Sequence, residues 1–216
     1  MKASDIQRAL MVKRYRRSFV LNNYTPIDWW ECDVFEITDA GYFREYEIKL
    51  SVSDFKADSK KEKRGWEYNP DTRVVTQPRI GGKHEMLASG DTRGPSAFSF
   101  VTPEGLIEGG SIPEWAGLIT AHWIPSHSAP WNVRLTIVRP PRRLHAQKIA
   151  TQIEQHAKGV CYYRMHNLFC FGKSTSLVDQ PEELKIPNTL AHVGEAELSL
   201  QNGNNLPSPM ENSSTR

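Results

Sequence analysis

The sequence predicts an α/β fold in which a mixed central β-sheet of about five strands is flanked by helices. Two segments rich in aromatic and branched residues, 29–37 and 42–50, are joined by a turn at 39–41 and predict a β-hairpin. Helical patterns precede and follow this hairpin, and three further strand-like segments end in another helical one. The order α, β, β, α, β, β, β, α suits a sheet layer covered by helices.

The first helix is expected over residues 4–17, where Ser4 can cap the start and Ile6 and Leu10 share one face. The next helix is expected over 52–64. Ser51 precedes it and is followed three places later by Asp54, which is the spacing of a capping box.

Residues 65–96 are rich in Gly, Pro, Asp and Arg and predict an irregular insertion that ends in a short helix at 83–87. Strands are then expected at 97–101, 116–123 and 131–139. In the last of these, apolar and polar residues alternate, which predicts one buried face.

Pro140 and Pro141 end the last strand, and residues 145–158 follow with the apolar spacing of an amphipathic helix. Ile149 and Ile153, one turn apart, lie on its expected inner face.

Composition divides the chain into a domain over 1–178 and a tail over 179–216. The tail is rich in Ser, Asn and Pro and is predicted to be disordered. It holds six acidic and two basic residues, a net charge of −4, so the total of +2 leaves +6 on the domain. Basic residues cluster at 8–17, 56–64 and 134–143, which favours a phosphate-rich partner. Solvated charged surfaces are the alternative interpretation.

The three cysteines are far apart and have no zinc-binding spacing, which suits a reducing compartment. The basic N-terminal stretch lacks the apolar core of a signal peptide, and no run is long enough to span a membrane. The sequence therefore predicts a cytoplasmic protein without a membrane partner, and it leaves the oligomeric state open.

The segment Glu47-Ile48-Lys49 lies on a predicted strand, so Glu47 and Lys49 project from the same face. The hairpin turn brings Asp33 alongside. Two carboxylates with a main-chain carbonyl, such as that of Ile48, offer the hard oxygen ligands that Mg²⁺ prefers. A lysine beside them can orient water or stabilise a developing oxyanion.

An acid two places before a lysine also occurs at 54–56, 58–60 and 183–185. The first two fall on a predicted helix, where such side chains diverge, and the third lies in the tail. Only 47–49 is on a strand. An ordinary surface ion pair is the alternative to a catalytic centre.

Asp33, the E-x-K segment after a hairpin and the helix that follows resemble the PD-(D/E)XK nuclease superfamily. More narrowly, the run EYEIKLSVSDFKADSKK resembles phage and bacterial proteins of the MmcB-like DNA-repair nuclease branch. The resemblance covers about residues 4–170. Its further blocks follow in order at 83–87, 98–107 and 112–119.

The resemblance implies a restriction-endonuclease-like fold and a metal-dependent deoxyribonuclease of phage or repair origin. It implies Asp33, Glu47 and the Ile48 carbonyl as ligands of Mg²⁺, or of Mn²⁺, and Lys49 as the catalytic lysine. DNA is the implied partner, and the residues expected to contact it are Lys56, Lys60, Lys61, Lys83 and His84.

The chain departs from the superfamily pattern at two points. Cys32 stands where the Pro of the family name precedes the first acid. The first helix offers only Asp5, so a third metal-binding acid is left open. A non-catalytic nucleic-acid-binding module on a nuclease fold and a phage structural or assembly protein are the alternative functions.

Overall fold

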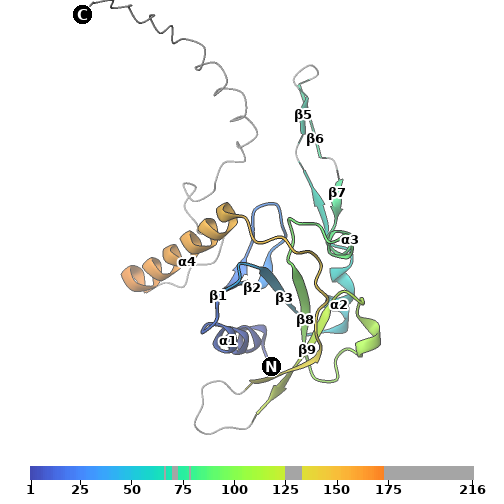
Figure 1. The fold of residues 1–216 in the computed structure, drawn as a ribbon, viewed down its shortest axis with the longest axis vertical. Helices are drawn as coiled ribbons and strands as arrows, with labels where there is room; N and C mark the ends of the chain where they lie inside the picture. Colours follow the sequence, from blue (N-terminus) through green and yellow to red (C-terminus); the bar gives the residue numbers. More distant parts are fainter. Residues whose placement is uncertain (66, 70–72, 78, 125–132, 173–216) are drawn as a thin grey trace, which may run out of the picture. The chain divides into compact units, whose positions relative to one another are not determined.

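A six-stranded β-sheet is the central element of the computed structural model, which describes residues 1–65, 67–69, 73–77, 79–124 and 133–172 (Figure 1). The predicted tail at 179–216 lies outside the described residues. The strands run in the spatial order β1 (Ser18–Tyr24), β2 (Cys32–Thr38), β3 (Phe43–Ile48), β8 (Ala97–Pro103), β9 (Gly117–Trp123) and β10 (Val133–Arg139).

Both parallel and antiparallel pairs occur in this sheet, so the predicted mixed α/β class is confirmed. β1, β2 and β3 form an antiparallel meander, β3, β8 and β9 are mutually parallel neighbours, and β10 returns antiparallel to β9. The expected number of about five strands was one too low, because β1 was not predicted.

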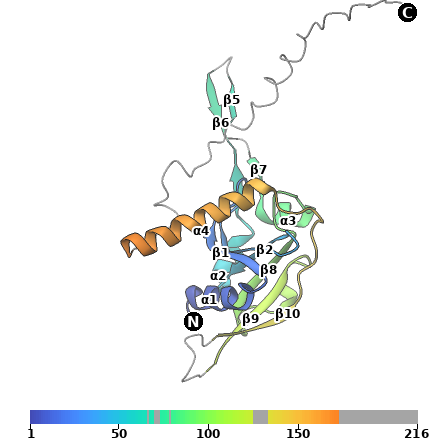
Figure 2. The ribbon, with the colours of Figure 1, turned by 60° about the vertical axis from the view of Figure 1, so that its left-hand side comes forward.

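Helices cover both faces of the sheet (Figures 1 and 2). On one face, α1 (Ala3–Arg14) packs Ile6 and Leu10 against residues of the central strands, including Tyr46. The opposite face holds an aromatic core that includes Phe35, Phe98 and Phe100, together with Trp29 and with Ala157 and Val160 of the last helix. No helix among the described residues is long and apolar enough to cross a membrane.

Two expected helix boundaries near the N-terminus and the hairpin were wrong. Ser4 lies inside α1 rather than capping it, and the Asp5 carboxylate accepts the Lys2 N–H at 2.8 Å instead. The helix expected over 52–64 is α2 (Val52–Asp58). It ends where the Asp58 side chain becomes fully buried among charged groups described below.

The insertion after α2 contains regular strands rather than only irregular chain. β4 (Glu62–Arg64) pairs with β7 (Arg79–Gly82), and β5 (Glu67–Asn69) pairs with β6 (Val74–Thr76). The β5–β6 ribbon projects away from the sheet in both views (Figures 1 and 2). The predicted short helix at 83–87 is confirmed as α3 (Lys83–Ser89).

The last helix, α4 (Thr151–Phe171), begins six residues later than the predicted 145 and continues past the predicted 158. Residues 140–150 form neither helix nor strand, and their backbone bonds to residues beside the central strands. Leu144 N–H donates to the Ser96 carbonyl, and Ile149 N–H donates to the Gly41 carbonyl, each at 2.9 Å. The short 3₁₀ helix η1 (Gly109–Ser111) lies in the connection between β8 and β9.

Candidate functional site

The hairpin of β2 and β3 places Asp33 beside the end of β3. Val34 lies opposite Tyr46 in the antiparallel register, so the preceding residue, Asp33, lies next to Glu47. Asp33 Oδ2 accepts the Ile48 N–H at 2.7 Å. The structure therefore brings together the two acids that the sequence paired, with the Ile48 backbone between them.

Glu45, Glu47 and Lys49 alternate along β3 and its end, so they share one face of the sheet. All three are buried. Lys49 Nζ lies 3.0 Å from Glu47 Oε1, and the Lys49 N–H donates to the Val101 carbonyl, which fixes the backbone at this point. Glu45 was missed in the sequence, although the alternation E-Y-E-I-K was the signal for it.

Helix α2 supplies another carboxylate, Asp58, that the sequence reasoning did not select. The Ser51 half of the predicted capping box is confirmed, since Ser51 Oγ accepts the Asp54 N–H at 3.1 Å, and Asp54 Oδ1 lies 3.5 Å from Lys49 Nζ. At the other end of the helix, Asp58 Oδ1 lies 2.9 Å from Lys49 Nζ and 2.8 Å from Lys61 Nζ.

Helix α3 supplies Lys83 and His84. Lys83 Nζ lies 2.7 Å from Glu45 Oε1 and 2.8 Å from Glu47 Oε2, and its side chain is completely buried. His84 Nε2 lies 2.8 Å from Asp58 Oδ2. Both residues were expected to contact DNA, but the Lys83 ammonium faces the buried acids rather than the surface.

The three remaining lysines expected at a DNA interface differ in exposure. Lys61 is 36% exposed and bridges Glu47 and Asp58, with its Nζ 2.5 Å from Glu47 Oε1. Lys56 and Lys60 are exposed on and just after α2. Lys56 and Lys60 are therefore the most exposed lysines of the predicted set.

We call this group the carboxylate–lysine cluster. It contains four carboxyl groups and three ammonium groups, drawn from β2, β3, α2, α3 and the loop after α2. Its members are Asp33, Glu45, Glu47, Asp58, Lys49, Lys61 and Lys83.

Mutual attraction fixes the charges at the centre of the cluster. Burial alone would lower the pKa of Lys49 and Lys83, but the adjacent carboxylates outweigh it and raise both pKa values. Burial would likewise raise the pKa of Glu47, but the charge of Lys83 and the other lysines lowers it. The pKa of Asp58 is also lowered, because the bond from His84 and the nearby lysines outweigh its burial. These groups are therefore all ionised near neutral pH.

Two acids at the margin of the cluster behave differently. Burial, followed by repulsion from Glu47, raises the pKa of Asp33 to about 6. Burial raises the pKa of Glu45 to about 7, despite the attraction of Lys83. The cluster can thus gain or lose protons at its edges without losing its central ion pairs.

Substituting Glu45 by glutamine should change the pH dependence of stability. A carboxyl group whose pKa is raised on folding stabilises the protein fully below its unfolded pKa, near 4.5, and loses that contribution as pH rises through about 7. We therefore expect the unfolding free energy of Glu45→Gln, relative to the parent, to increase with pH across this window. Urea unfolding at a series of pH values measures it, and a difference that stays flat would contradict the assigned shift.

Trp29 closes the cluster on one side and depends on a glycine. Its Nε1–H donates to Glu45 Oε2 at 2.7 Å, and its side chain is buried. A Cβ built on Gly94 would lie 2.4 Å from Trp29 Cη2.

Gly94→Ala should consequently lower the unfolding free energy by about 1–3 kcal/mol, the usual range for overpacking a core. Gly110→Ala is the matched control, because a Cβ there meets no atom within 4 Å. Equal urea midpoints for the two variants would show that the Trp29 ring moves aside for the added methyl group without loss of stability.

The donor set at Asp33 and Glu47 suits Mg²⁺ better than a transition metal. Within the described residues, no group of three or more His, Cys, Asp or Glu side chains is arranged to hold a metal ion. Mg²⁺, however, commonly binds through one or two carboxylates and keeps several waters. Asp33, Glu47 and the Ile48 carbonyl would supply such oxygens. The Glu47 oxygens are contacted by Lys49, Lys61 and Lys83, and Lys61 is the partly exposed one.

Comparisons with known proteins give a fold relative but no function. No family model and no curated protein matches the chain. A solved structure of a protein of unknown function from Silicibacter pomeroyi matches with a TM-score of 0.50 and 17% identity, covering 81% of this chain and 92% of that one. This similarity supports the fold alone.

Proposed function

We propose that the chain is a Mg²⁺-dependent nuclease that hydrolyses DNA phosphodiester bonds, with Asp33, Glu47 and Lys49 at its centre. The observation that carries the proposal is the position of these three residues side by side at the ends of neighbouring strands. Asp33 contacts the Ile48 backbone, and Lys49 contacts Glu47. The resemblance of the same residues to the PD-(D/E)XK pattern supports the assignment.

Lys49 is suited to stabilise negative charge rather than to remove a proton. Its ammonium is held between Glu47 and Asp58 at 3.0 and 2.9 Å, and these carboxylates raise its pKa. A fixed cation in a site of low water content stabilises a phosphorane-like oxyanion without having to reorient. Lys49 therefore fits the role of oxyanion stabiliser.

A bound Mg²⁺ supplies a Lewis acid for a phosphate oxygen and lowers the pKa of a coordinated water. To bind the metal ion, Glu47 must have an oxygen that is free of its lysine partners. Lys61 is the partner best able to move away from Glu47, because its side chain is partly exposed whereas those of Lys49 and Lys83 are buried. Asp33, raised in pKa to about 6, is mostly ionised and ready to bind a cation at neutral pH.

Lys56 and Lys60 are proposed to contact the DNA backbone beside the cluster. Both are exposed and follow the strand that carries Glu47. Contacts of this kind position the backbone without reading its sequence, and they weaken as salt displaces them.

The test is release of fragments from labelled duplex, single-stranded and branched DNA, and from RNA, in Mg²⁺, Mn²⁺ or EDTA. The proposal expects cleavage of at least one DNA form with a divalent ion and none with EDTA. Cleavage that persists in EDTA would exclude the assigned centre, and cleavage of RNA alone would correct the substrate.

A non-catalytic nucleic-acid-binding module is the second candidate, and one observation favours it. Lysine ammonium groups contact both oxygens of Glu47, so a metal ion is not needed to neutralise this buried acid. Salt-sensitive DNA binding without cleavage of any form, in Mg²⁺ or Mn²⁺, would place this candidate first.

A further inference from the structure

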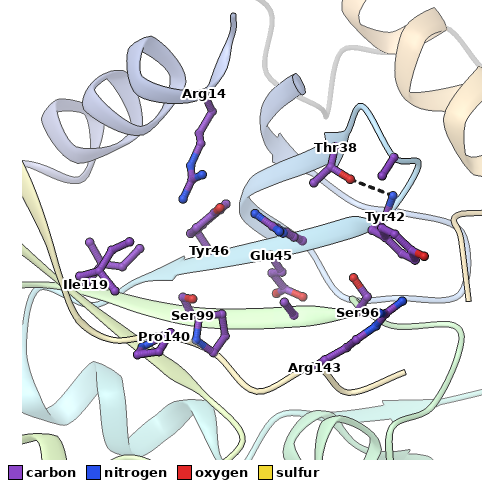
Figure 3. Close-up of a pocket in the computed structure, with 15 residues that line it drawn as sticks. Arg14, Thr38, Tyr42, Glu45, Tyr46, Ser96, Ser99, Ile119, Pro140 and Arg143 are labelled. Atoms are coloured by element: carbon purple, nitrogen blue, oxygen red, sulfur yellow. Dashed lines mark hydrogen bonds between the residues drawn. The ribbon is translucent and has the colours of Figure 1, made fainter. Parts of the chain in front are cut away.

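A cavity lies on the opposite face of the sheet from the carboxylate–lysine cluster. It has a volume of about 640 Å³, within the usual range of small-molecule sites. Its walls come from the C-terminal end of α1, the turn between β2 and β3, the central strands and the segment 140–143 (Figure 3). Helix α1 contributes Arg14 to these walls.

Three arginines line the cavity, and two of them have unused hydrogen-bonding capacity. The Arg44 guanidinium makes no hydrogen bond or ion pair with another residue in the described parts of the chain. Arg14 Nε is buried without a hydrogen-bond acceptor there, and its nearest carboxylate contact is Glu36 at 4.0 Å. The Arg143 guanidinium lies 4.8 Å from the centre of the Tyr42 ring.

Two glutamates near the cavity are already paired. Glu36 accepts hydrogen bonds from Ser18 Oγ at 2.6 Å and from Tyr46 Oη at 2.5 Å. Glu45 contributes to the wall, but its carboxylate is bound by Lys83 and Trp29 of the other face. The charged residues that line the cavity are three arginines and Glu45, so the lining is net positive.

The rest of the lining is largely apolar. Ile119, Ile137 and Pro140 lie along it together with Pro141 and Ala97. Figure 3 shows Tyr42 and Arg143 on the right of the cavity, and Arg14, Tyr46, Ile119 and Pro140 on the left. Ile137 is half exposed although it lies on a strand whose face was expected to be buried.

We infer that this cavity binds an aromatic phosphate ester of about the size of a nucleoside monophosphate. A guanidinium with free donors pairs with phosphate through charge-assisted, often bidentate hydrogen bonds, which Arg44 and Arg14 can supply. The apolar wall of Ile119, Ile137 and Pro140 accommodates a flat ring. A ligand with only one of these parts would leave either the cations or the apolar wall unused. This site is independent of the proposed nuclease activity.

Titration calorimetry of the full chain with deoxyadenosine 5′-monophosphate, in EDTA to exclude metal-dependent binding at the cluster, tests the inference. We expect one molecule to bind per chain. Deoxyadenosine and inorganic phosphate, tested separately, should each bind at least about tenfold more weakly, since each lacks half of the recognition.

Arg44→Gln should weaken binding of the nucleotide by about tenfold or more, because it removes a charged hydrogen-bonding group. Arg134→Gln is the matched control: it removes the same charge from an exposed position that does not line the cavity. Melting temperatures close to that of the parent would show that both variants fold.

Three outcomes would overturn the inference. They are no heat of binding for the parent at millimolar nucleotide, equal loss of affinity in the two arginine variants, and binding of inorganic phosphate as tight as that of the nucleotide. The last result would leave an anion site without an aromatic part. None of these outcomes bears on DNA cleavage, so a failure here is distinct from a failure of the proposed function.

Discussion

Replacing Asp33 by asparagine should reduce Mg²⁺-dependent DNA cleavage by about 100-fold or more. Asparagine keeps the shape and can still accept the Ile48 N–H, but it removes the anionic ligand that would hold the cation and its activated water. Lys49→Gln should cause a loss of similar size by removing the cation that faces the developing oxyanion. Initial rates on a DNA form that the parent cleaves, at saturating Mg²⁺, measure both effects.

Asp54→Asn is the matched control for the loss of an acidic charge. Asp54 Oδ1 lies 3.5 Å from Lys49 Nζ, but its side chain is half exposed and has no proposed metal contact. The Asp54→Asn variant should cleave DNA at a rate near that of the parent. If Asp33→Asn cleaves DNA as fast as Asp54→Asn, Asp33 is not a metal ligand. If folded Lys49→Gln cleaves DNA as fast as Asp54→Asn, Lys49 is not the catalytic lysine.

Removing the Lys83 ammonium should produce the largest loss of stability, about 3–5 kcal/mol. Lys83→Met keeps most of the side-chain volume but leaves Glu45 and Glu47 without the cation that contacts them at 2.7 and 2.8 Å in a fully buried site. The expected result is a strongly lowered urea midpoint at neutral pH. A double variant, Lys83→Met with Glu45→Gln, should recover part of the loss, because one of the two stranded charges is gone.

Lys158→Met is the control for an ion pair at the surface. Lys158 Nζ lies 2.6 Å from Glu154 Oε1 one helical turn away, but the lysine is largely exposed. Such pairs contribute only about 0.3–0.5 kcal/mol. Similar losses in the two single variants would mean that the Lys83 contacts are no more stabilising than a surface pair.

The hairpin and the central strands could be predicted because their residues have local signals. Segments 32–38 and 43–48 carry branched and aromatic residues around a tight turn, and the position of Ser51 marked the start of α2. β1 has no comparable signal: it follows a basic run and ends in Asn22-Asn23-Tyr24. It is a strand because it pairs with β2.

The same distinction between local and distant causes applies to the site. Glu47 and Lys49 share a strand, so their proximity follows from the two-residue repeat of β structure. Asp58 was missed, and Lys83 was expected at a DNA surface. Both errors arose because these residues reach the cluster through tertiary contacts. A buried lysine is unusual, and only the position of its partner acids reveals it.

Strand β3 carries two incompatible sets of side chains on its opposite faces: Glu45 and Glu47 on one, Arg44 and Tyr46 on the other. A shift of one residue in its pairing with β2 or β8 would exchange these sets. Arg44 would then lie beside the buried Lys83, and the two glutamates would lose this ammonium partner. Misaligned sheets are therefore penalised by electrostatic repulsion as well as by lost packing, so this alternation acts as a check on correct strand alignment while the protein folds.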